Sequence, residues 1–244
     1  DKGVGRMLSE TFRVNPKARF YQASTSEMFG STNPPQSEIS PFQPVSPYAE
    51  AKLNGHNRVL EYRKKGFYAV SGFLFNHESP RRGKHFVTRK VTHSFVKLKL
   101  GLQDAVRLGN LEAKRDWGFA GDYVEAMWLM LQQEVPDDYV IATGESYSVR
   151  EFVEAVGNEL GMKITWQGKG LDEKGVDENG KVIVKIDERY FRPHDVDSLQ
   201  GDSTKARSKL AWQPKVTFKD LVKMMVASDM KLIAGREDHH VEDD

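Results

Sequence analysis

The segment Phe67–Phe75 constrains the fold more than any other part of this sequence. It has the sequence FYAVSGFLF, in which nearly every residue is apolar or small. A strand with one face in water alternates polar and apolar residues, whereas an unbroken apolar run is typical of a strand covered on both faces by helices. Similar runs occur at Ala18–Ala23 and at Tyr139–Ala142. Helix-like segments separate these runs, so the sequence predicts a parallel α/β sheet.

The predicted helices are recognised by apolar residues at helical spacing and by their capping residues. They cover residues 1–15, 47–65, 87–100, 122–133, 148–160 and 217–233. Ser148 and Glu151 form a capping-box pattern at the start of one of them. Short strands are expected at 105–108 and 181–187, and the glycine-rich, charged stretch 167–180 predicts a surface loop.

Composition excludes several classes of function. The formal net charge is +1, which gives no reason to expect a nucleic-acid partner. No apolar run approaches the ~20 residues of a membrane span, so no membrane partner is expected. The chain has no Cys, which excludes disulfides and thiol catalysis and is compatible with the reducing cytoplasm.

Tyr48 and Lys52 lie four residues apart at the start of a predicted helix, so their side chains share one helical face. A Lys ammonium near a phenol stabilises the phenolate and lowers its pKa from the usual ~10, which makes Tyr48 a candidate general base. The same spacing also occurs on ordinary solvated helix faces. Its setting is more specific, because Thr25 and Glu27 end the preceding predicted strand. Open α/β sheets place their chemistry at that end of their strands.

The chain opens without the glycine-rich turn that binds a dinucleotide. The nearest pattern, Gly3-Val4-Gly5, lies in a predicted helix and follows no strand. A dinucleotide fold binds the pyrophosphate at its first strand–turn–helix. We therefore expect the chain to begin inside such a fold, with roughly 100 residues of βα units absent before it.

The strand, the Thr25–Glu27 triplet and the Tyr48/Lys52 pair together resemble the extended short-chain dehydrogenase/reductase family, whose catalytic groups are Thr or Ser, Tyr and Lys. Longer matches resemble, within that family, the GDP-mannose 4,6-dehydratases. These matches are Ser24–Glu27, Asn76–Gly83, Phe86–Lys90, Gly109–Leu111, Lys114–Gly118, Asp122–Trp128 and Arg192-Pro193.

Two positions separate the chain from related patterns. Ser26 stands where dTDP-glucose 4,6-dehydratases have Asp, and simple epimerases lack an acid in this triplet. Asp195 stands where the GDP-mannose enzymes usually carry Glu, so a substrate hydroxyl contact there is in question.

The resemblance implies conversion of GDP-mannose to GDP-4-keto-6-deoxymannose with bound NADP, by C4 oxidation, loss of water across C5 and C6, and C6 reduction. Tyr48, assisted by Lys52, would remove the C4 hydroxyl proton, and Thr25 would hydrogen-bond the same oxygen. Glu27 would remove the C5 proton and help to protonate the leaving C6 hydroxyl.

The resemblance also implies further binding residues, for most of which an ordinary surface role is the alternative. The cofactor-binding residues would be Ser24, Tyr48, Lys52, His77, Arg81 and Arg82. The substrate-binding residues would be Ser26, Asn76, Lys90, Arg115, Arg192 and Asp195. Arginine forks suit phosphate oxygens, so Arg115 and Arg192 are the expected diphosphate clamps, with Asn76 on the pyrophosphate and Lys90 on the guanine. No metal is expected, because His56, His239 and His240 lack the spacing of ligands.

The expected architecture is a Rossmann-like doubly wound parallel sheet, incomplete at its N-terminus, with a smaller α/β substrate-binding domain. Residues 1–76 and 115–143 would form the NADP-binding part, and residues 77–114 and 144–244 the GDP-sugar-binding part. The Arg81–Arg82 loop would reach the NADP of a neighbouring subunit in a cytoplasmic homotetramer, a dimer of dimers. The alternatives are another sugar-nucleotide dehydratase or epimerase, or a non-catalytic nucleotide-binding fragment.

Overall fold

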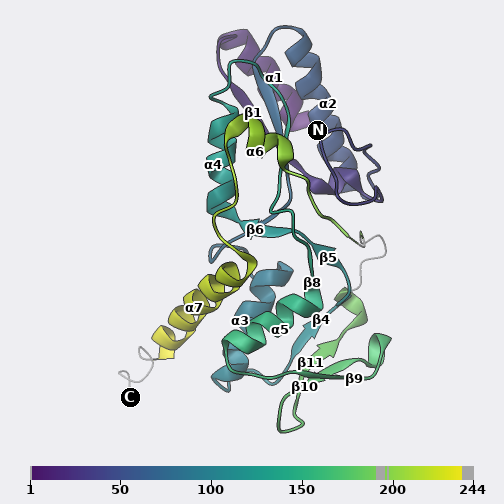
Figure 1. The fold of residues 1–244 in the computed structure, drawn as a ribbon, viewed down its shortest axis with the longest axis vertical. Helices are drawn as coiled ribbons and strands as arrows, with labels where there is room; N and C mark the ends of the chain where they lie inside the picture. Colours follow the sequence, from purple (N-terminus) through teal and green to yellow (C-terminus); the bar gives the residue numbers. More distant parts are fainter. Residues whose placement is uncertain (1, 191–195, 197, 238–244) are drawn as a thin grey trace. The chain divides into compact units, whose positions relative to one another are not determined.

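The computed structural model describes residues 2–190, 196 and 198–237. The chain divides into two compact units, whose elements are labelled in Figure 1. Unit 1 consists of Asp1–His77, Lys114–Ser146 and Val196–Lys215, and unit 2 of Glu78–Ala113, Tyr147–Asp195 and Val216–Asp244.

Unit 1 is built on a three-stranded parallel sheet in the order β1-β2-β7. Its helices are α1 (Lys2–Val14), η1 (Ser26–Phe29), α2 (Pro47–Lys64), α4 (Ala120–Met130) and α6 (Thr204–Leu210). Its strands are β1 (Phe20–Thr25), β2 (Ala69–Leu74), β5 (Lys114–Arg115), β6 (Trp117–Phe119) and β7 (Tyr139–Ile141), and β3 (Asn76–Glu78) lies where the chain passes into unit 2.

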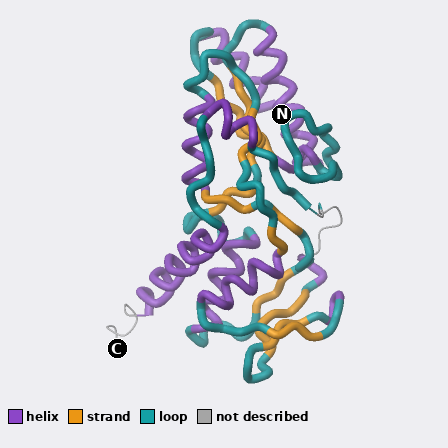
Figure 2. The backbone as a smooth tube through the Cα atoms, viewed as in Figure 1, coloured by secondary structure: helices purple, strands orange, loops and turns teal. Residues whose placement is uncertain are grey.

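Every residue of β2 is buried, because helices cover both faces of the sheet. Ala69 packs with residues of α1 and α2, whereas Val70 and Leu74 pack with residues of α4 and α6. Neighbouring residues of β2 therefore face opposite sides of the sheet, as the two-residue period of a strand requires. Figure 2 shows the strands of this sheet between the helices. The predicted parallel α/β sheet with a doubly covered central strand is confirmed.

The helix that carries Tyr48 and Lys52 begins as its sequence predicts. The Ser46 hydroxyl accepts a hydrogen bond from the Ala49 amide at 3.1 Å, and Pro47 occupies the first helical position. After the helix, Gly66 adopts φ +84°, a left-handed conformation that favours glycine. Both ends of α2 are therefore fixed by local chemistry, which sets the register of the face that carries Tyr48 and Lys52.

The segment 196–215, which the sequence had grouped with the substrate-binding part, belongs to unit 1. Its helix α6 packs against β7 and α4, and the buried Trp212 donates its indole N–H to the Asp122 carbonyl at 2.8 Å. The apolar residues of α6 complete the core on one face of the sheet. Its position thus follows from long-range burial, which chain order did not reveal.

Unit 2 combines three longer helices with a four-stranded sheet in the order β4-β11-β10-β9. The helical elements are α3 (Val87–Lys99), α5 (Val149–Glu159), η2 (Gly170–Asp172), η3 (Glu188–Tyr190) and α7 (Phe218–Glu237). The strands are β4 (Val106–Leu108), β8 (Tyr147–Ser148), β9 (Thr165–Gln167), β10 (Lys174–Val176) and β11 (Val182–Ile186). The predicted capping box at Ser148 and Glu151 is present at the start of α5.

The prediction of a loop over 167–180 was wrong, because β10 lies within it and pairs with β9 and β11. Gly175 is buried at the centre of β10, opposite Trp166 and Val184. A Cβ there would come within 3.0–3.2 Å of Ile164, Val184 and Trp166. The glycine that suggested a loop is a close-packing position within a strand.

Candidate active site

The carboxyl end of β1 carries the first part of the predicted site. Ser24, Thr25 and Ser26 are buried, and Glu27 is partly exposed at the start of η1. The Thr25 hydroxyl caps this turn by accepting a hydrogen bond from the Glu27 amide at 3.3 Å. The turn after the strand therefore fixes Thr25 while its neighbouring carboxylate stays accessible.

Helix α2 supplies the second part of the site and packs against β1 and η1. The Lys52 ammonium donates a hydrogen bond to the Ala23 carbonyl at 2.8 Å, and its Nζ lies 5.7 Å from the centre of the Tyr48 ring. Partial burial lowers the pKa of Lys52. Tyr48 itself is 55% exposed, so its ring is open to solvent. Unit 1 therefore places the Tyr48/Lys52 pair beside the end of β1.

Ser24 ends in a buried polar atom without a partner. Its Oγ makes no hydrogen bond within the described residues. A buried hydroxyl without a partner costs free energy, on the order of 1–3 kcal/mol by analogy with other unsatisfied polar groups. Such a group at the carboxyl end of a parallel strand fits a site that hydrogen-bonds a ligand.

Asn76 and His77 follow β2 at the same edge of the sheet, since Thr25 of β1 lies opposite Leu74 of β2. The His77 Nδ1 donates to the Phe75 carbonyl at 2.9 Å, and the imidazole stacks on the Tyr123 ring with centroids 5.3 Å apart. These two contacts hold the ring in one orientation.

Arg115 is buried rather than presented on the surface. Its Nη1 donates to the carbonyls of Val196 and Lys114, at 2.7 and 2.8 Å. The guanidinium thus anchors residue 196, the neighbour of the predicted substrate residue Asp195. Arg192 and Asp195 lie outside the described residues, as do His239 and His240.

Asp116 is a buried residue of unit 1 that the sequence analysis did not single out. Its carboxylate accepts hydrogen bonds from the amides of Thr143 and Gly144 at 2.9 Å each, from the Thr143 hydroxyl at 2.7 Å and from the Gly201 amide at 3.3 Å. It therefore fixes the turn after β7, at the same end of the sheet as Thr25. The signal for Asp116 in the sequence was its position inside the Lys114–Gly118 motif, between Arg115 and Trp117.

The remaining predicted residues belong to unit 2. Arg81 is exposed, whereas Arg82 is paired with the buried carboxylate of Glu78. The Lys90 ammonium lies 3.2 Å from the centre of the Tyr190 ring, and burial lowers the pKa of Lys90. Tyr190 is 47% exposed, so its ring is accessible beside the lysine.

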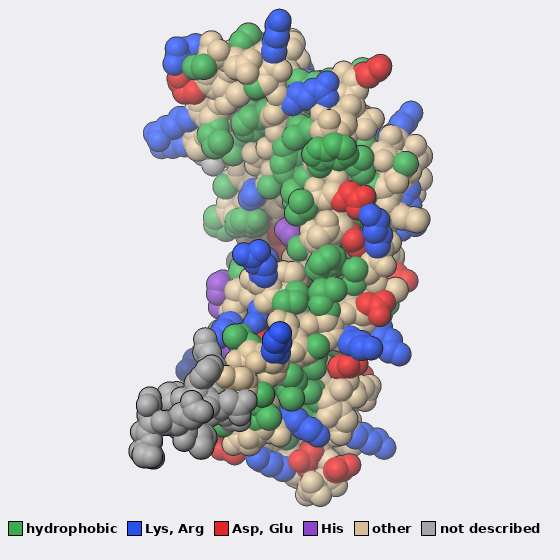
Figure 3. Space-filling view, turned by 90° about the vertical axis from the view of Figure 1, so that its left-hand side faces the viewer, with side chains coloured by type: hydrophobic (Ala, Val, Ile, Leu, Met, Phe, Trp, Pro, Cys, Tyr) green, Lys and Arg blue, Asp and Glu red, His purple; other side chains and the backbone are tan. Residues whose placement is uncertain are grey.

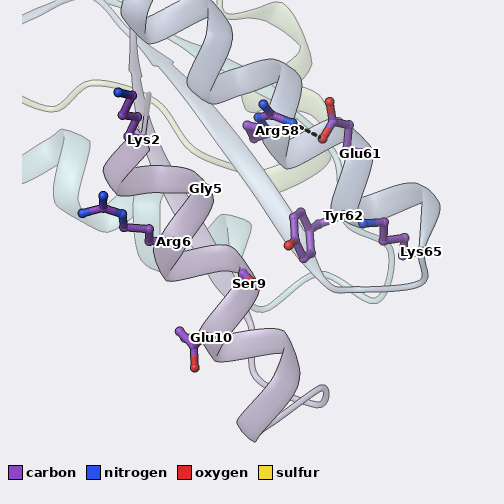
Figure 4. A pocket seen from close by; sticks show the side chains of 9 residues that line it. All are labelled: Lys2, Gly5, Arg6, Ser9, Glu10, Arg58, Glu61, Tyr62 and Lys65. Atoms are coloured by element: carbon purple, nitrogen blue, oxygen red, sulfur yellow. Dashed lines mark hydrogen bonds and ion pairs between the residues drawn. The ribbon is translucent and has the colours of Figure 1, made fainter.

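A separate open pocket of about 700 Å³ lies between α1 and α2 of unit 1 (Figure 4). Lys2, Arg6, Arg58 and Lys65 bring positive charge to it, and a dashed line in the figure marks the pair of Arg58 with Glu61. It is lined by none of the predicted catalytic residues, although α2 carries Tyr48 and Lys52 as well as part of the pocket lining. This pocket is thus distinct from the predicted catalytic residues at the end of β1.

Two further features bear on ligands and partners. No group of three or more His, Asp or Glu able to hold a metal occurs in the described part of the chain. None of its helices is long and apolar enough to cross a membrane. On the face drawn in Figure 3, Lys and Arg side chains are interspersed with Asp and Glu, in keeping with the net charge of +1.

The sheet and the residues at its carboxyl edge define a Rossmann-type α/β protein of the short-chain dehydrogenase/reductase kind. The solved structure of RMD from Pseudomonas aeruginosa complexed with NADPH has the same fold, with a TM-score of 0.77 at 18% identity, and the match covers 94% of this chain and 72% of that one. A family model for GDP-mannose 4,6 dehydratase matches residues 2–225. The chain belongs to that family.

Curated relatives support the assignment. The chain is 53% identical to GDP-mannose 4,6 dehydratase 2 of Caenorhabditis elegans over 91% of its length, and 55% identical to GDP-mannose 4,6 dehydratase of Drosophila melanogaster over 95%. It spans 58% and 60% of the lengths of these two relatives.

Proposed function

We propose that the intact protein is a GDP-mannose 4,6-dehydratase that forms GDP-4-keto-6-deoxymannose. The observation that carries the proposal is the group at the end of β1, with Thr25, Glu27 and Lys52 of the family pattern beside an exposed Tyr48. The identity to curated dehydratases over most of the chain supports the choice of substrate.

Tyr48 acts as the base that takes the proton from the C4 hydroxyl. Its exposure leaves the phenol accessible to a sugar, and the Lys52 ammonium lies 5.7 Å from the centre of its ring. Lys52 is held for this role by its hydrogen bond to the Ala23 carbonyl. Thr25, fixed at the turn, donates its hydroxyl hydrogen to the same C4 oxygen.

Glu27 acts after C4 has become a ketone. A 4-ketone acidifies the proton on C5, which the carboxylate removes, and the C6 hydroxyl leaves as water after receiving a proton. Since position 26 is Ser, one carboxylate serves both transfers. Glu27 is partly exposed and follows directly on the capping Thr25, a position from which it can reach a bound sugar.

NADP, when bound, supplies the redox chemistry by taking hydrogen from C4 and returning it to C6, so no external reductant is consumed. The residues present fit such a group, because the buried Ser24 Oγ lacks a partner and the His77 ring is fixed at the same edge of the sheet. Ser24, Tyr48, Lys52 and His77 of unit 1 would contact the cofactor, and the Arg81–Arg82 loop of unit 2 would reach the NADP of a neighbouring subunit.

The substrate contacts are proposed from the family resemblance and from where each side chain lies. Ser26 and Asn76 lie at the edge of the sheet, where they would contact the sugar and the pyrophosphate. Lys90, beside the aromatic Tyr190, would contact the base. Arg115, which donates to two backbone carbonyls, keeps the diphosphate role expected from the sequence, as do Arg192 and Asp195 their expected roles.

The cytoplasmic location and the tetramer expected from the sequence stay predictions. Light scattering of the intact protein, with and without NADP, tests the second. Changing both Arg81 and Arg82 to Ala is expected to weaken NADP binding and tetramer formation together. A double variant that stays tetrameric and binds NADP like the parent would remove the loop from both roles.

The direct test is to incubate the intact protein with GDP-mannose and NADP and to follow the 4-keto product without added reductant. Formation of that product supports the dehydratase. Activity only with another sugar nucleotide would favour a different dehydratase or an epimerase. Binding of nucleotide without turnover would favour the non-catalytic alternative.

A further inference from the structure

Unit 2 contains a buried carboxylate to which no role has been given. Glu78 is 1% exposed, and its Oε2 accepts a hydrogen bond from the Thr88 hydroxyl at 2.6 Å. Burial raises the pKa of Glu78, while the Arg82 charge and the Thr88 hydrogen bond oppose that rise. A buried carboxylate needs a nearby cation, and the Arg82 guanidinium is that cation.

The Arg82 guanidinium is fixed on two sides. Its Nε lies 3.1 Å from Glu78 Oε2, an ion-pair contact in which the N–H is not well aligned for a hydrogen bond. Its central carbon lies 3.6 Å from the centre of the Phe86 ring. A charge contact along one edge and an aromatic ring on one face determine the plane of the group.

The backbone of the same loop is held independently. Arg89 donates through Nη1 to the Pro80 carbonyl and, at 3.4 Å, to the Arg82 carbonyl. Arg89 is held in turn by Asp229, which is fully buried, through Nε at 2.9 Å and Nη2 at 2.6 Å. The loop that carries the two arginines is therefore clamped at its backbone by Arg89 and at one side chain by Glu78.

The two arginines of the loop differ in what remains available for a ligand. Arg82 is 25% exposed, and its Nη1 and Nη2 make no hydrogen bond within the described residues. These two nitrogens form the fork that pairs with phosphate oxygens. The exposed Arg81 lacks a comparable hold within the same residues, so its side chain loses more conformational freedom on binding.

We propose that Glu78 is a positioning residue that holds Arg82, stacked on Phe86, ready to bind an anionic group of the cofactor through its free fork. The proposal rests on the proposed function, which supplies NADP as the ligand. Glu78 acts through Arg82 and touches neither substrate nor cofactor. A purely structural Glu78 is the competing explanation, and it predicts that the two side chains contribute to NADP affinity independently.

A double-mutant cycle on the intact protein separates these explanations, with NADP affinity measured by calorimetry. Arg82→Ala is expected to weaken NADP binding about tenfold and Glu78→Gln about fivefold, in the range of a charge-assisted contact. In the Arg82→Ala background, Glu78→Gln should have no further effect. Glu112→Gln is the matched control, because Glu112 forms an exposed ion pair with Arg150 in the same unit and should leave affinity unchanged.

Arginine side-chain NMR on the intact protein without cofactor gives an independent measurement. The Arg82 Nε–H signal, assigned by its loss in Arg82→Lys, should exchange slowly with water in the parent. It should exchange rapidly in Glu78→Gln while the Arg89 signal, held by Asp229, is unchanged. Retention of the Arg89 signal also shows that Glu78→Gln is folded.

The outcomes decide between the hypotheses. An equal loss of NADP affinity on Glu78→Gln with and without Arg82, or an Arg82 signal that Glu78→Gln does not alter, overturns the positioning role. A folded parent that binds no NADP overturns the cofactor assignment of the proposed function instead, and the NMR comparison then decides the role of Glu78.

Discussion

The end of β1 in unit 1 and the α3–α7 region in unit 2 treat their polar side chains in opposite ways. Tyr48 is largely exposed, and the buried Ser24 hydroxyl lacks a partner. Asp229, by contrast, is fully buried and accepts hydrogen bonds from Arg89 and Thr92. Side chains proposed to act on a ligand keep hydrogen-bonding capacity for that ligand. Side chains that stabilise the fold hydrogen-bond to one another instead.

The substitution expected to have the largest effect is Tyr48→Phe in the intact protein, and the effect is on kcat. Removing the phenolic base should lower kcat about a thousandfold, within the range typical of general bases, with GDP-mannose binding and Tm almost unchanged. Steady-state kinetics and thermal unfolding measure both. Tyr62→Phe on the same helix is the control, and a Tyr48→Phe variant that kept most of its kcat would refute the base role.

Asp229→Asn tests the α3–α7 region of unit 2. It leaves the buried Arg89 without its counter-ion, so we expect the free energy of unfolding to fall by about 3 kcal/mol. Chemical denaturation measures the loss. Asp104→Asn removes an exposed pair with Lys181 and should change stability by less than about 0.5 kcal/mol. Equal effects of the two variants would contradict the contrast between buried and exposed pairs.

Glu27→Gln sharpens the account of the β1 site by separating two steps. Removing the carboxylate should slow elimination about a hundredfold while C4 oxidation continues. Reduced nicotinamide should then accumulate on the enzyme when GDP-mannose is added, and its absorbance reports this. If activity is lost without that signal, Glu27 is needed before or during oxidation.

The smallest effect concerns Asp187, a surface counterpart of Asp229 in unit 2. The hydrogen bond from Arg189 lowers the pKa of Asp187 to about 2 from its usual 3.8. A carboxyl whose pKa is lowered by folding stabilises the fold above the unfolded value and loses that contribution as pH falls through the folded value. The Tm of the parent should therefore drop slightly more than that of Asp187→Asn between pH 5 and pH 2.

Much of the fold and part of the site could be predicted because the relevant physics is local. The apolar run at Phe67–Phe75 required a doubly covered strand, and Ser46-Pro47 marked the start of the helix. Once that helix is formed, Tyr48 and Lys52 share a face by geometry alone. The charged, glycine-rich 167–180 stretch was misleading, since Gly175 is explained only by its pairing with β9 and β11, which the composition of the stretch does not show.

The sequence by itself therefore determined the parallel sheet, the helix that carries Tyr48 and Lys52, and the family motifs, all of which depend on neighbours along the chain. Only the tertiary structure decided that 196–215 belongs to unit 1, that Arg115 is buried on backbone carbonyls, and that Arg82 differs from Arg81. The free energy of a charged side chain depends on the burial and partners that folding gives it. For Arg89 that partner is Asp229, 140 positions away, which no local pattern records.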